Sequence, residues 1–170
     1  ALQVSADDDA LTIGVAKTGD QQWELTVQLT NPNTTYSAFQ IDLQLPDGIT
    51  LNTSSVARAT RTSSLEMQAS IASNGLPRVV GYAKAKTNTI IGTRGTIFTA
   101  SLTTRATLAD GDYEIVAKNV RFTTATGDET VLPNATCTLT IEEPAEYKLT
   151  YWNEGDTYYP ILLKEGDPIP

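Results

Sequence analysis

Histidine is absent from this chain of 170 residues, and cysteine occurs once. Without histidine, the sequence lacks the usual general base of serine and cysteine hydrolases and the commonest transition-metal ligand. The single cysteine, Cys137, excludes an internal disulfide and a zinc site built from several cysteines. Cys137 alternates in phase with Leu139 and Ile141, so we expect a buried, unreactive thiol, because a reactive one needs cationic or dipolar activation.

Positive charge and long apolar runs are also scarce. Lysine and arginine number 12 against 20 aspartates and glutamates, which gives a formal net charge of −8. Such a surface repels the phosphates of nucleic acids and of anionic membranes, so we expect neither as a partner. No apolar run is long enough to span a bilayer. No signal peptide is visible, and residues 1–5 already read as a strand, so we expect any export signal to have been removed before them.

Alternation of apolar and polar residues is what the sequence has in abundance. The clearest case is a set of four apolar residues at every second position: Trp23, Leu25, Val27 and Leu29. This is the pattern of a strand with one buried face, and it returns in residues 39–45 and 136–141. The 27 threonines also favour strands. Strands do not alternate with helices, so the sequence predicts an all-β, antiparallel β-sandwich of immunoglobulin-like or jelly-roll type.

Turn residues divide the chain into short candidate strands. Glycine, proline, asparagine and aspartate mark most of the boundaries. The candidate strands are residues 2–5, 11–17, 22–30, 36–45, 49–51, 57–62, 78–84, 96–104, 112–116, 120–124 and 136–142. Residues 63–73 have some helix-favouring side chains but no sustained apolar stripe, so we expect a loop there with at most one helical turn.

A change of composition at residues 142–146, which read as a short acidic linker, predicts two units. The first, residues 1–143, holds the sandwich, and the second, residues 144–170, holds the linker and a β-hairpin. Two runs in the second unit, residues 147–152 and 158–164, flank a natural turn. Two strands alone are marginally stable in water. We therefore expect the hairpin either to pack on the sandwich or to open a further domain.

Four segments resemble the strands of a known family: FQIDLQLPDGI, GTIFTASL, GDYEI and NVRFT. They resemble the early core strand and the late strands of cohesin-like domains, and the resemblance covers roughly residues 11–142. Cohesin-like domains belong to the broad carbohydrate-binding-module-like group of sandwiches. They are extracellular bacterial modules that hold protein partners, most famously dockerins. The resemblance therefore implies a cohesin-like sandwich that binds a protein.

The tail resembles the start of an internalin-type B-repeat, a small β-grasp unit of bacterial surface proteins. The strand at residues 147–151, then Gly155, Tyr158 and the turn at residues 166–169 follow the order of that repeat. The helix and last strands of the unit do not follow in this sequence. Together the two resemblances imply a segment of a secreted, multi-module bacterial surface protein, and hence an extracellular or cell-surface location.

Three adjacent carboxylates, Asp7, Asp8 and Asp9, are the candidate metal site. Carboxylate oxygens suit Ca²⁺, a hard cation that takes several oxygen ligands. Three sequence neighbours cannot all converge on one ion without further ligands, and no EF-hand spacing follows. A solvated turn is the alternative to a calcium site, and we expect no other cofactor.

Exposed aromatic side chains are the candidates for sugar binding, because pyranose CH groups pack on ring faces. Trp23 shares the phase of a buried face, so we expect it in the core. Tyr82 can face either way. The densest cluster holds Tyr151, Trp152, Tyr158 and Tyr159, which read either as a sugar platform or as the apolar face of an incomplete module.

Half of the chain's 12 cations lie between residues 58 and 94. Most of them sit on or beside neighbouring candidate strands: Arg58, Arg61, Arg78, Lys84, Lys86 and Arg94. Arginine is favoured at protein interfaces, which suggests a partner-docking face. Edge strands also carry cations that block unwanted pairing, and the sequence does not choose between the two roles.

Catalysis is not expected. Glycoside hydrolysis needs two carboxylates across a sugar, and Glu24 and Asp42, on expected outer faces of strands, show no sign of facing one another. We therefore predict a non-enzymatic extracellular module for adhesion or protein-partner binding, which presents a flat sheet face. A carbohydrate-binding module and a passive structural spacer are the alternatives.

Overall fold

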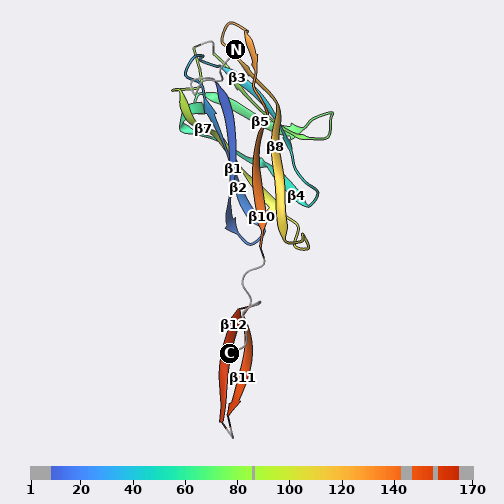
Figure 1. Cartoon of the computed structure of the whole chain (residues 1–170). Helices are drawn as coiled ribbons and strands as arrows, with labels where there is room; N and C mark the ends of the chain where they lie inside the picture. The colour runs from blue at the N-terminus through green and yellow to red at the C-terminus, as the bar shows by residue number, and fades with distance from the viewer. Residues whose placement is uncertain (1–8, 86, 143–146, 155–156, 165–170) are drawn as a thin grey trace, which may run out of the picture.

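The computed structural model describes residues 9–85, 87–142, 147–154 and 157–164. Within them the chain forms strands and one short 3-10 turn, η1 (Thr60–Thr62), arranged as Figure 1 shows. The strands are β1 (Ala10–Gly19), β2 (Gln22–Thr30), β3 (Ala38–Gln44), β4 (Ile49–Arg58), β5 (Leu65–Ile71), β6 (Pro77–Ala83), β7 (Arg94–Thr104), β8 (Gly111–Thr123), β9 (Glu129–Val131), β10 (Ala135–Ile141), β11 (Tyr147–Glu154) and β12 (Thr157–Lys164). No helix among the described residues is long and apolar enough to cross a membrane.

Two antiparallel sheets pack face to face around the core (Figure 1). The first, which we call the β2 sheet, has the strand order β1-β2-β7-β4. The second, the β3 sheet, has the order β10-β8-β3-β6-β5, with the short β9 paired to one end of β8. The prediction of an all-β, antiparallel sandwich is therefore confirmed.

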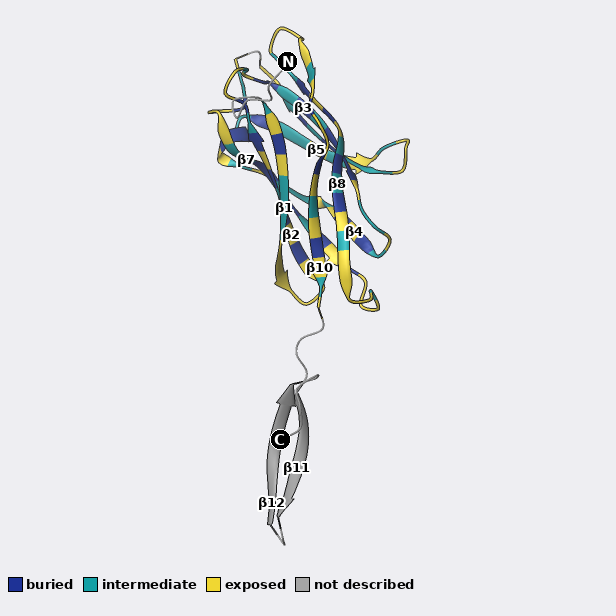
Figure 2. Ribbon diagram, viewed as in Figure 1, coloured by how far each residue is buried: buried dark blue, intermediate teal, exposed yellow. Residues whose placement is uncertain are grey.

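Buried residues alternate with more exposed ones along many of the strands (Figure 2), and the buried side chains fill the space between the two sheets. From the β2 sheet, β2 contributes Trp23, Leu25, Val27 and Leu29. From the β3 sheet, β3 contributes Phe39, Ile41 and Leu43. Trp23 is 9% exposed, so its predicted place in the core is confirmed. Cys137 is half-buried against the same core, and burial raises the pKa of its thiol, as expected of an unreactive cysteine.

A glycine allows β3 and β6 to pack beneath the core aromatics. Phe39 lies opposite Gly81, and its ring stacks on those of Phe98 and Phe122 at centroid distances of 5.8 and 5.5 Å. A Cβ on Gly81 would lie 2.3 Å from Phe39 Cε1, which is closer than real atoms approach. The Phe39 ring therefore occupies the space that any other residue at this position would need.

The prediction of a loop at residues 63–73 is wrong. Leu65–Ile71 forms β5, and all its residues pair with β6. The inward positions are held by Leu65, Met67 and Ala69, of which only Leu65 is fully buried. Because flexible and small side chains fill this edge strand, its apolar alternation is weak, and helix-favouring residues mask it.

Irregularities in pairing join strands that the sequence separates. The two candidate strands between residues 49 and 62 are mostly one strand, β4, which has a register shift between Asn52 and Ala57 and is followed by η1. The two candidate strands between residues 112 and 124 are likewise one strand, β8, whose bulge holds Asn119 at a φ of 52°. The three-residue β9 has no counterpart in the prediction.

β11 and β12 form a separate two-stranded sheet, as the sequence predicts. The division of the chain into units 1–143 and 144–170 stays a prediction, as does the resemblance of the tail to a B-repeat. The candidate strand at residues 2–5 lies outside the described residues.

Candidate functional site

The outward side of the β3 sheet carries the side chains that alternate with its core residues. We call this surface the β3-sheet face. Its central members, taken from β8 across to β5, are Lys118, Arg121, Ala38, Gln40, Asp42, Arg78, Val80, Tyr82, Glu66 and Gln68. Two of the predicted binding residues, Arg78 and Tyr82, therefore share one face and one strand.

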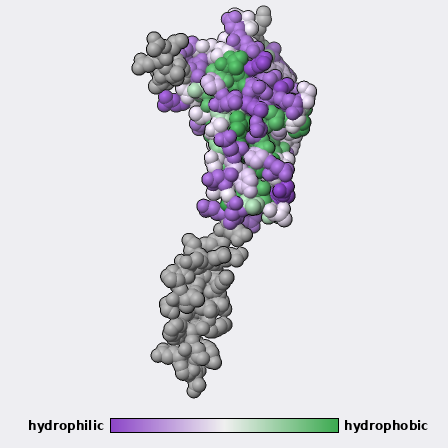
Figure 3. Space-filling model, turned by 45° about the vertical axis from the view of Figure 1, so that its right-hand side comes forward, coloured by the Kyte–Doolittle hydropathy of each residue, from purple (hydrophilic) through white to green (hydrophobic). Residues whose placement is uncertain are grey.

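The middle of the β3-sheet face is uncharged. Ala38 lies opposite Tyr82, and Gln40 lies opposite Val80, and all four residues are half-buried. The Tyr82 hydroxyl accepts a long hydrogen bond, of 3.5 Å, from Gln68. Figure 3 shows apolar residues reaching the surface of the sandwich as a patch among polar ones. Tyr82 is the one aromatic side chain that the described part of the chain places on this face.

Charged side chains surround this centre. Arg121 Nη1 lies 3.5 Å from Glu129 Oε1 in β9, and Lys84 Nζ lies 3.7 Å from Glu66 Oε1 in β5. Lys118 Nζ donates to a glutamine side chain of β3 at 2.8 Å. Exposed pairs of this kind contribute little to stability, so their charges stay available to a partner.

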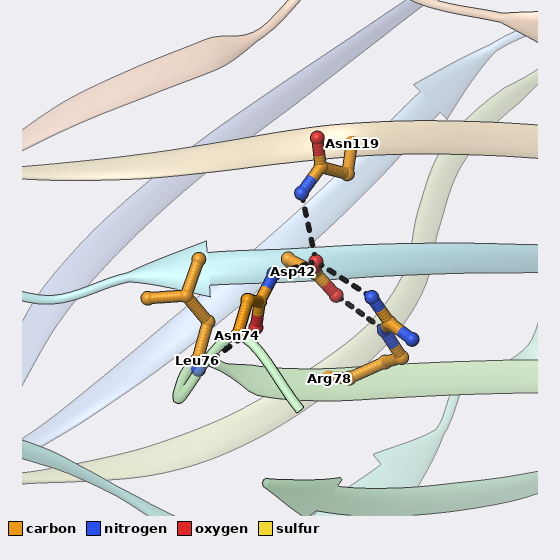
Figure 4. A network of polar contacts seen from close by, with 5 residues as sticks. All are labelled: Asp42, Asn74, Leu76, Arg78 and Asn119. Carbon is orange, nitrogen blue, oxygen red and sulfur yellow. Dashed lines mark hydrogen bonds and ion pairs between the residues drawn. The ribbon is translucent and has the colours of Figure 1, made fainter. Parts of the chain in front are cut away.

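A buried carboxylate lies at one end of the β3-sheet face (Figure 4). Asp42 is fully buried, and its two oxygens accept hydrogen bonds of 2.6 and 3.0 Å from Arg78. Asn119 of the β8 bulge and Asn74 of the β5–β6 turn also donate to Oδ2, at 2.8 and 3.1 Å. Hydrogen bonding from Arg78, above all, lowers the pKa of Asp42 to about 2, because it stabilises the ionised form.

The position of Asp42 corrects its predicted exposure and removes a candidate catalytic pair. Asp42 projects from the outward side of β3, as expected, but its own hydrogen-bond partners cover it. Glu24 is exposed on the outward side of the β2 sheet. The two carboxylates therefore point away from opposite faces of the sandwich and cannot flank one sugar.

Arg61 is not part of a docking face, contrary to the prediction. It is 9% exposed, and its guanidinium donates to main-chain oxygens and to one side-chain amide. The acceptors are the carbonyls of Leu29, Ile91, Gly92 and Gly95 and the side chain of Asn31. Burial lowers the pKa of Arg61. The acceptors come from segments that are distant in sequence, so no local pattern identifies this arginine as buried.

The remaining predicted cations are scattered over the sandwich. Arg58 is exposed at the end of β4, where Nη1 donates to two main-chain oxygens at 3.2 Å each. Arg94 is exposed at the start of β7, in the other sheet. Lys84 joins Arg78 beside the β3-sheet face, and Lys86 lies outside the described residues. The five described cations therefore do not form one docking surface.

The aromatic cluster belongs to the hairpin. Trp152 lies in β11, and Tyr158 and Tyr159 lie in β12. The register pairs Trp152 with Tyr159 and Asn153 with Tyr158. Tyr82 belongs to the sandwich, so these aromatic residues come from two separate sheets. Their role in binding stays a prediction.

Asp9 is the one predicted metal ligand that the structure describes, since Asp7 and Asp8 lie outside it. The Tyr36 hydroxyl donates to Asp9 Oδ2, while Asp9 Oδ1 is buried and has no hydrogen-bond partner within the described part of the chain. Burial, together with the bond to Asp9, raises the pKa of Tyr36. Among the described residues, no group of three or more acidic, cysteine or histidine side chains could hold a metal ion. Calcium binding stays a prediction.

A cleft at one end of the sandwich has no signal in the sequence. It has a volume of about 320 Å³ and lies between the β1–β2 turn, the β7–β8 loop and the end of β10. Trp23 lines it, and the indole Nε1 is buried with no hydrogen-bond partner among the residues that the structure describes. Lys17, Arg105 and Glu142 line it as well. Among the described residues its lining holds one carboxylate, that of Glu142, and no cysteine.

The outward side of the β2 sheet differs from the β3-sheet face. Its middle presents small or polar uncharged side chains such as Thr12, Thr26, Thr99 and Ser101. Within the described strands of this sheet, that middle lacks the larger apolar side chains found around Val80. The two outer faces of the sandwich are therefore chemically distinct.

No protein-family model and no curated protein matches the sequence. Solved structures do match. A cohesin module of a family 33 glycoside hydrolase from Clostridium perfringens gives a TM-score of 0.65 at 15% identity, over 80% of this chain and 98% of that one. A cohesin from R. flavefaciens, in complex with a group 1 dockerin, gives 0.58 at 16% identity, over 84% and 100%. A cohesin from Clostridium thermocellum, also in complex with a dockerin, gives 0.59 at 14% identity, over 75% and 96%.

These matches span nearly the whole of each cohesin, and at such identities the likeness is one of fold. The resemblance of residues 11–142 to cohesin-like domains is thereby confirmed at the level of the fold. The sandwich formed by the β2 and β3 sheets has the cohesin fold.

Proposed function

We propose that this chain is a non-catalytic module that binds a protein partner on its β3-sheet face. The observation that carries the proposal is the layout of that face, with an uncharged centre around Val80 and Tyr82 inside a ring of charged side chains. Protein interfaces have this anatomy, in which an apolar core is surrounded by a polar rim. A flat sheet suits a protein surface better than a small ligand, which needs a concave site.

The charge of this face favours an acidic footprint on the partner. Four cations lie on or beside it, and three carboxylates pair with three of them: Arg78 with Asp42, Lys84 with Glu66, and Arg121 with Glu129. Lys118 pairs with no carboxylate among the described residues. The chain as a whole has a net charge of −8. Asp112 and Glu114 lie farther along β8 on the same side. The centre of the β3-sheet face is therefore less acidic than the chain as a whole and favours an acidic partner surface.

The structural neighbours support the class of function. Two of the matching cohesins were solved in complex with dockerins, which are proteins. For this chain we propose the same general role, in which a cohesin-type sandwich holds a protein partner. An extracellular setting and a part in adhesion belong to the proposal and rest on the two sequence resemblances.

A display selection followed by mutagenesis tests this proposal. Protein fragments displayed on phage are panned against the purified full chain, and recovered binders are measured by titration calorimetry. We expect Tyr82→Ala and Arg121→Glu each to weaken binding by about tenfold or more, since tyrosine and arginine dominate interface energetics. Thr26→Ala and Glu24→Gln, on the outward side of the β2 sheet, are the matched controls and should leave affinity unchanged.

Two outcomes would overturn the proposal. Binders that lose affinity with the Thr26 and Glu24 variants, but not with those of Tyr82 and Arg121, would place the site on the other sheet. A glycan-array signal that disappears in Tyr82→Ala, with no protein binder recovered, would establish a carbohydrate-binding module instead.

A further inference from the structure

β5 is the outer strand of the β3 sheet, and one of its two edges is unpaired within the described residues. The hydrogen bond from Ala72 N to Leu76 O, in the β5–β6 hairpin, fixes the direction of each peptide group. Residues of an antiparallel ladder alternate between pairs that exchange hydrogen bonds and pairs that do not. Ala72 and Leu76 form a hydrogen-bonded pair, so every second residue before Ala72 also bonds to β6. The residues between them, Met67, Ala69 and Ile71, therefore direct their N–H and C=O groups away from β6, toward the open edge.

The upstream end of this edge is already closed. Leu65 O belongs to the same outward series, and it accepts a hydrogen bond of 3.2 Å from Arg58 Nη1. This hydrogen bond is consistent with the peptide directions derived from the hairpin, because Leu65 O must point away from β6 to reach Arg58. The open stretch therefore comprises the peptide groups of Met67, Ala69 and Ile71.

β5 differs from the other long edges of the sandwich in the regularity of its pairing. β4 and β1 each have a register shift, β10 lies beside β1, and β4 lies beside β5 without pairing to it in a ladder. β5 pairs in continuous register and contains no lysine, arginine or proline. Ile71, at its end, is 61% exposed. A regular edge whose only charged residue, Glu66, lies on the outward side pairs readily with another strand, and natural proteins rarely leave one open.

We propose that the occupant of this edge is the β5 edge of a second copy of the chain, paired antiparallel about a two-fold axis through Ala69. In this register Ala69 faces the same residue of the second copy, and Met67 faces Ile71, so all the open groups are used at once. A two-fold axis requires a self-complementary surface. The open stretch meets that requirement because it is symmetric about its middle residue.

The side chains also fit this register. On the outward side, Glu66 would face Ala72 and Gln68 would face Ser70, so no charge meets a like charge. On the core side, each exposed Ile71 would cover the half-buried Met67 of the other copy. Two neighbouring registers are less favourable. If the second copy were shifted by one pairing step toward Leu65, its strand would need the Leu65 carbonyl, which already accepts a hydrogen bond from Arg58. If it were shifted the other way, Met67 would face the β5–β6 hairpin turn of the second copy.

The contact is small, so the dimer should be weak. Interfaces below roughly 1,200 Å² are typical of transient association, and two paired edge strands fall in that class. Each copy has a net charge of −8, and added salt screens the resulting repulsion. Association should therefore strengthen with ionic strength. Pairing at the β5 edge leaves the β3-sheet face uncovered, so partner binding there is compatible with it.

Sedimentation equilibrium of the full chain tests for the dimer. We expect a monomer–dimer equilibrium that is populated by about 1 mM protein and is stronger at about 0.5 M salt than at 0.1 M. Ile71→Lys should leave only monomer, because a charge on an edge strand opposes pairing. Val131→Lys is the matched control, since Val131 is 66% exposed on β9, and it should leave the equilibrium unchanged.

Amide hydrogen exchange, followed by NMR at low and high protein concentration, tests the register. Protection should rise with concentration at Met67, Ala69 and Ile71, and it should not change at Gln68 and Ser70, whose amides point toward β6. A chain that is monomeric at about 1 mM would overturn the proposal. So would a dimer that survives Ile71→Lys, or one that forms without protection of these three amides.

Discussion

Asp42 couples the stability of the sandwich to pH. Its pKa is about 2 in the folded chain, against 3.8 for an ordinary aspartate. A carboxyl group whose pKa is lowered by folding stabilises the fold above its unfolded pKa, and that stability is lost as the pH falls through the folded pKa. We expect the unfolding free energy to fall by about 2 kcal/mol from this group between about pH 4 and pH 2, as measured by urea denaturation. Asp42→Asn should flatten the profile in that window, and an unchanged profile would contradict the assignment.

The contribution of Arg61 to stability depends on the planar shape of its guanidinium as well as on its charge. A lysine in its place cannot reach acceptors spread around a planar guanidinium, and it leaves several buried carbonyls unpaired. We expect Arg61→Lys to lower the unfolding free energy by about 2–4 kcal/mol. Arg94→Lys is the matched control, because Arg94 is exposed at the start of β7. It should change the unfolding free energy by less than about 0.5 kcal/mol. Equal effects of the two substitutions in chemical denaturation would show that the acceptors do not hold Arg61.

Gly81 is required by the ring opposite it. Gly81→Ala places a Cβ against Phe39 and should lower the unfolding free energy by about 1–3 kcal/mol, because overpacked cores must shift. Phe39→Leu in the same chain should recover part of this loss relative to the Phe39→Leu single variant, so the double-mutant cycle should show a coupling. Gly14→Ala is the matched control, since no atom lies within 4 Å of its Cβ position. A large loss in Gly14→Ala, or no coupling with Phe39, would contradict this account.

At the scale of strands, the β8 bulge shows what a single backbone conformation contributes. Asn119 has a positive φ and also donates to Asp42. Asn119→Gly keeps the conformation and loses the hydrogen bond, whereas Asn119→Ala loses both. We expect losses of about 1 and 2 kcal/mol respectively in urea denaturation. If the alanine variant were as stable as the glycine variant, the bulge would not depend on the left-handed conformation.

The strands that sequence reasoning finds are those with a strong alternation of large apolar side chains. β2 is predicted residue for residue, because Trp23 and its neighbours alternate without a break. β5 is missed, because Met67 and Ala69 give a weak signal at an edge. β8 is divided in two, because the bulge at Asn119 interrupts the period of two. Local pattern therefore predicts central strands well and fails where edges and bulges break the alternation.

The candidate site is only partly readable from the sequence for a related reason. Tyr82 is a candidate from the sequence as an exposed aromatic, and Arg78 as a cation of a docking face; both lie on the β3-sheet face, and their role in binding stays a prediction. Arg61 is of the same type, yet it is buried among carbonyls that only the folded chain assembles. Asp42 is expected on an outer face, but its burial depends on Asn74 and Arg78, which lie more than thirty positions away in the sequence. Contacts between segments that are distant in sequence determine which charged side chains are exposed to solvent. A local sequence pattern does not predict these contacts.

At the scale of the whole molecule, the cohesin fold leaves two outer faces with different chemistry. The β3-sheet face combines an uncharged centre with paired charges, and the other outer face is mainly small and polar. The β5 edge lies beside the first of these faces but points sideways. The two contacts that we propose use separate surfaces of one sandwich, so substitutions at Tyr82 and at Ile71 should affect partner binding and self-association independently.

The described chain enters the sandwich and leaves it at opposite ends (Figure 1). β1 begins at Ala10, whereas Ile141, at the end of β10, lines the cleft beside Lys17 near the other end of β1. Tension between these points acts along strands whose hydrogen bonds run crosswise, so many bonds must rupture together. Single-molecule pulling from Ala10 and Ile141 should need more force than pulling from Ala10 and Thr30, which unzips the β1–β2 pair bond by bond. The sandwich would then serve as a tension-bearing link, and similar forces in both directions would rule that out.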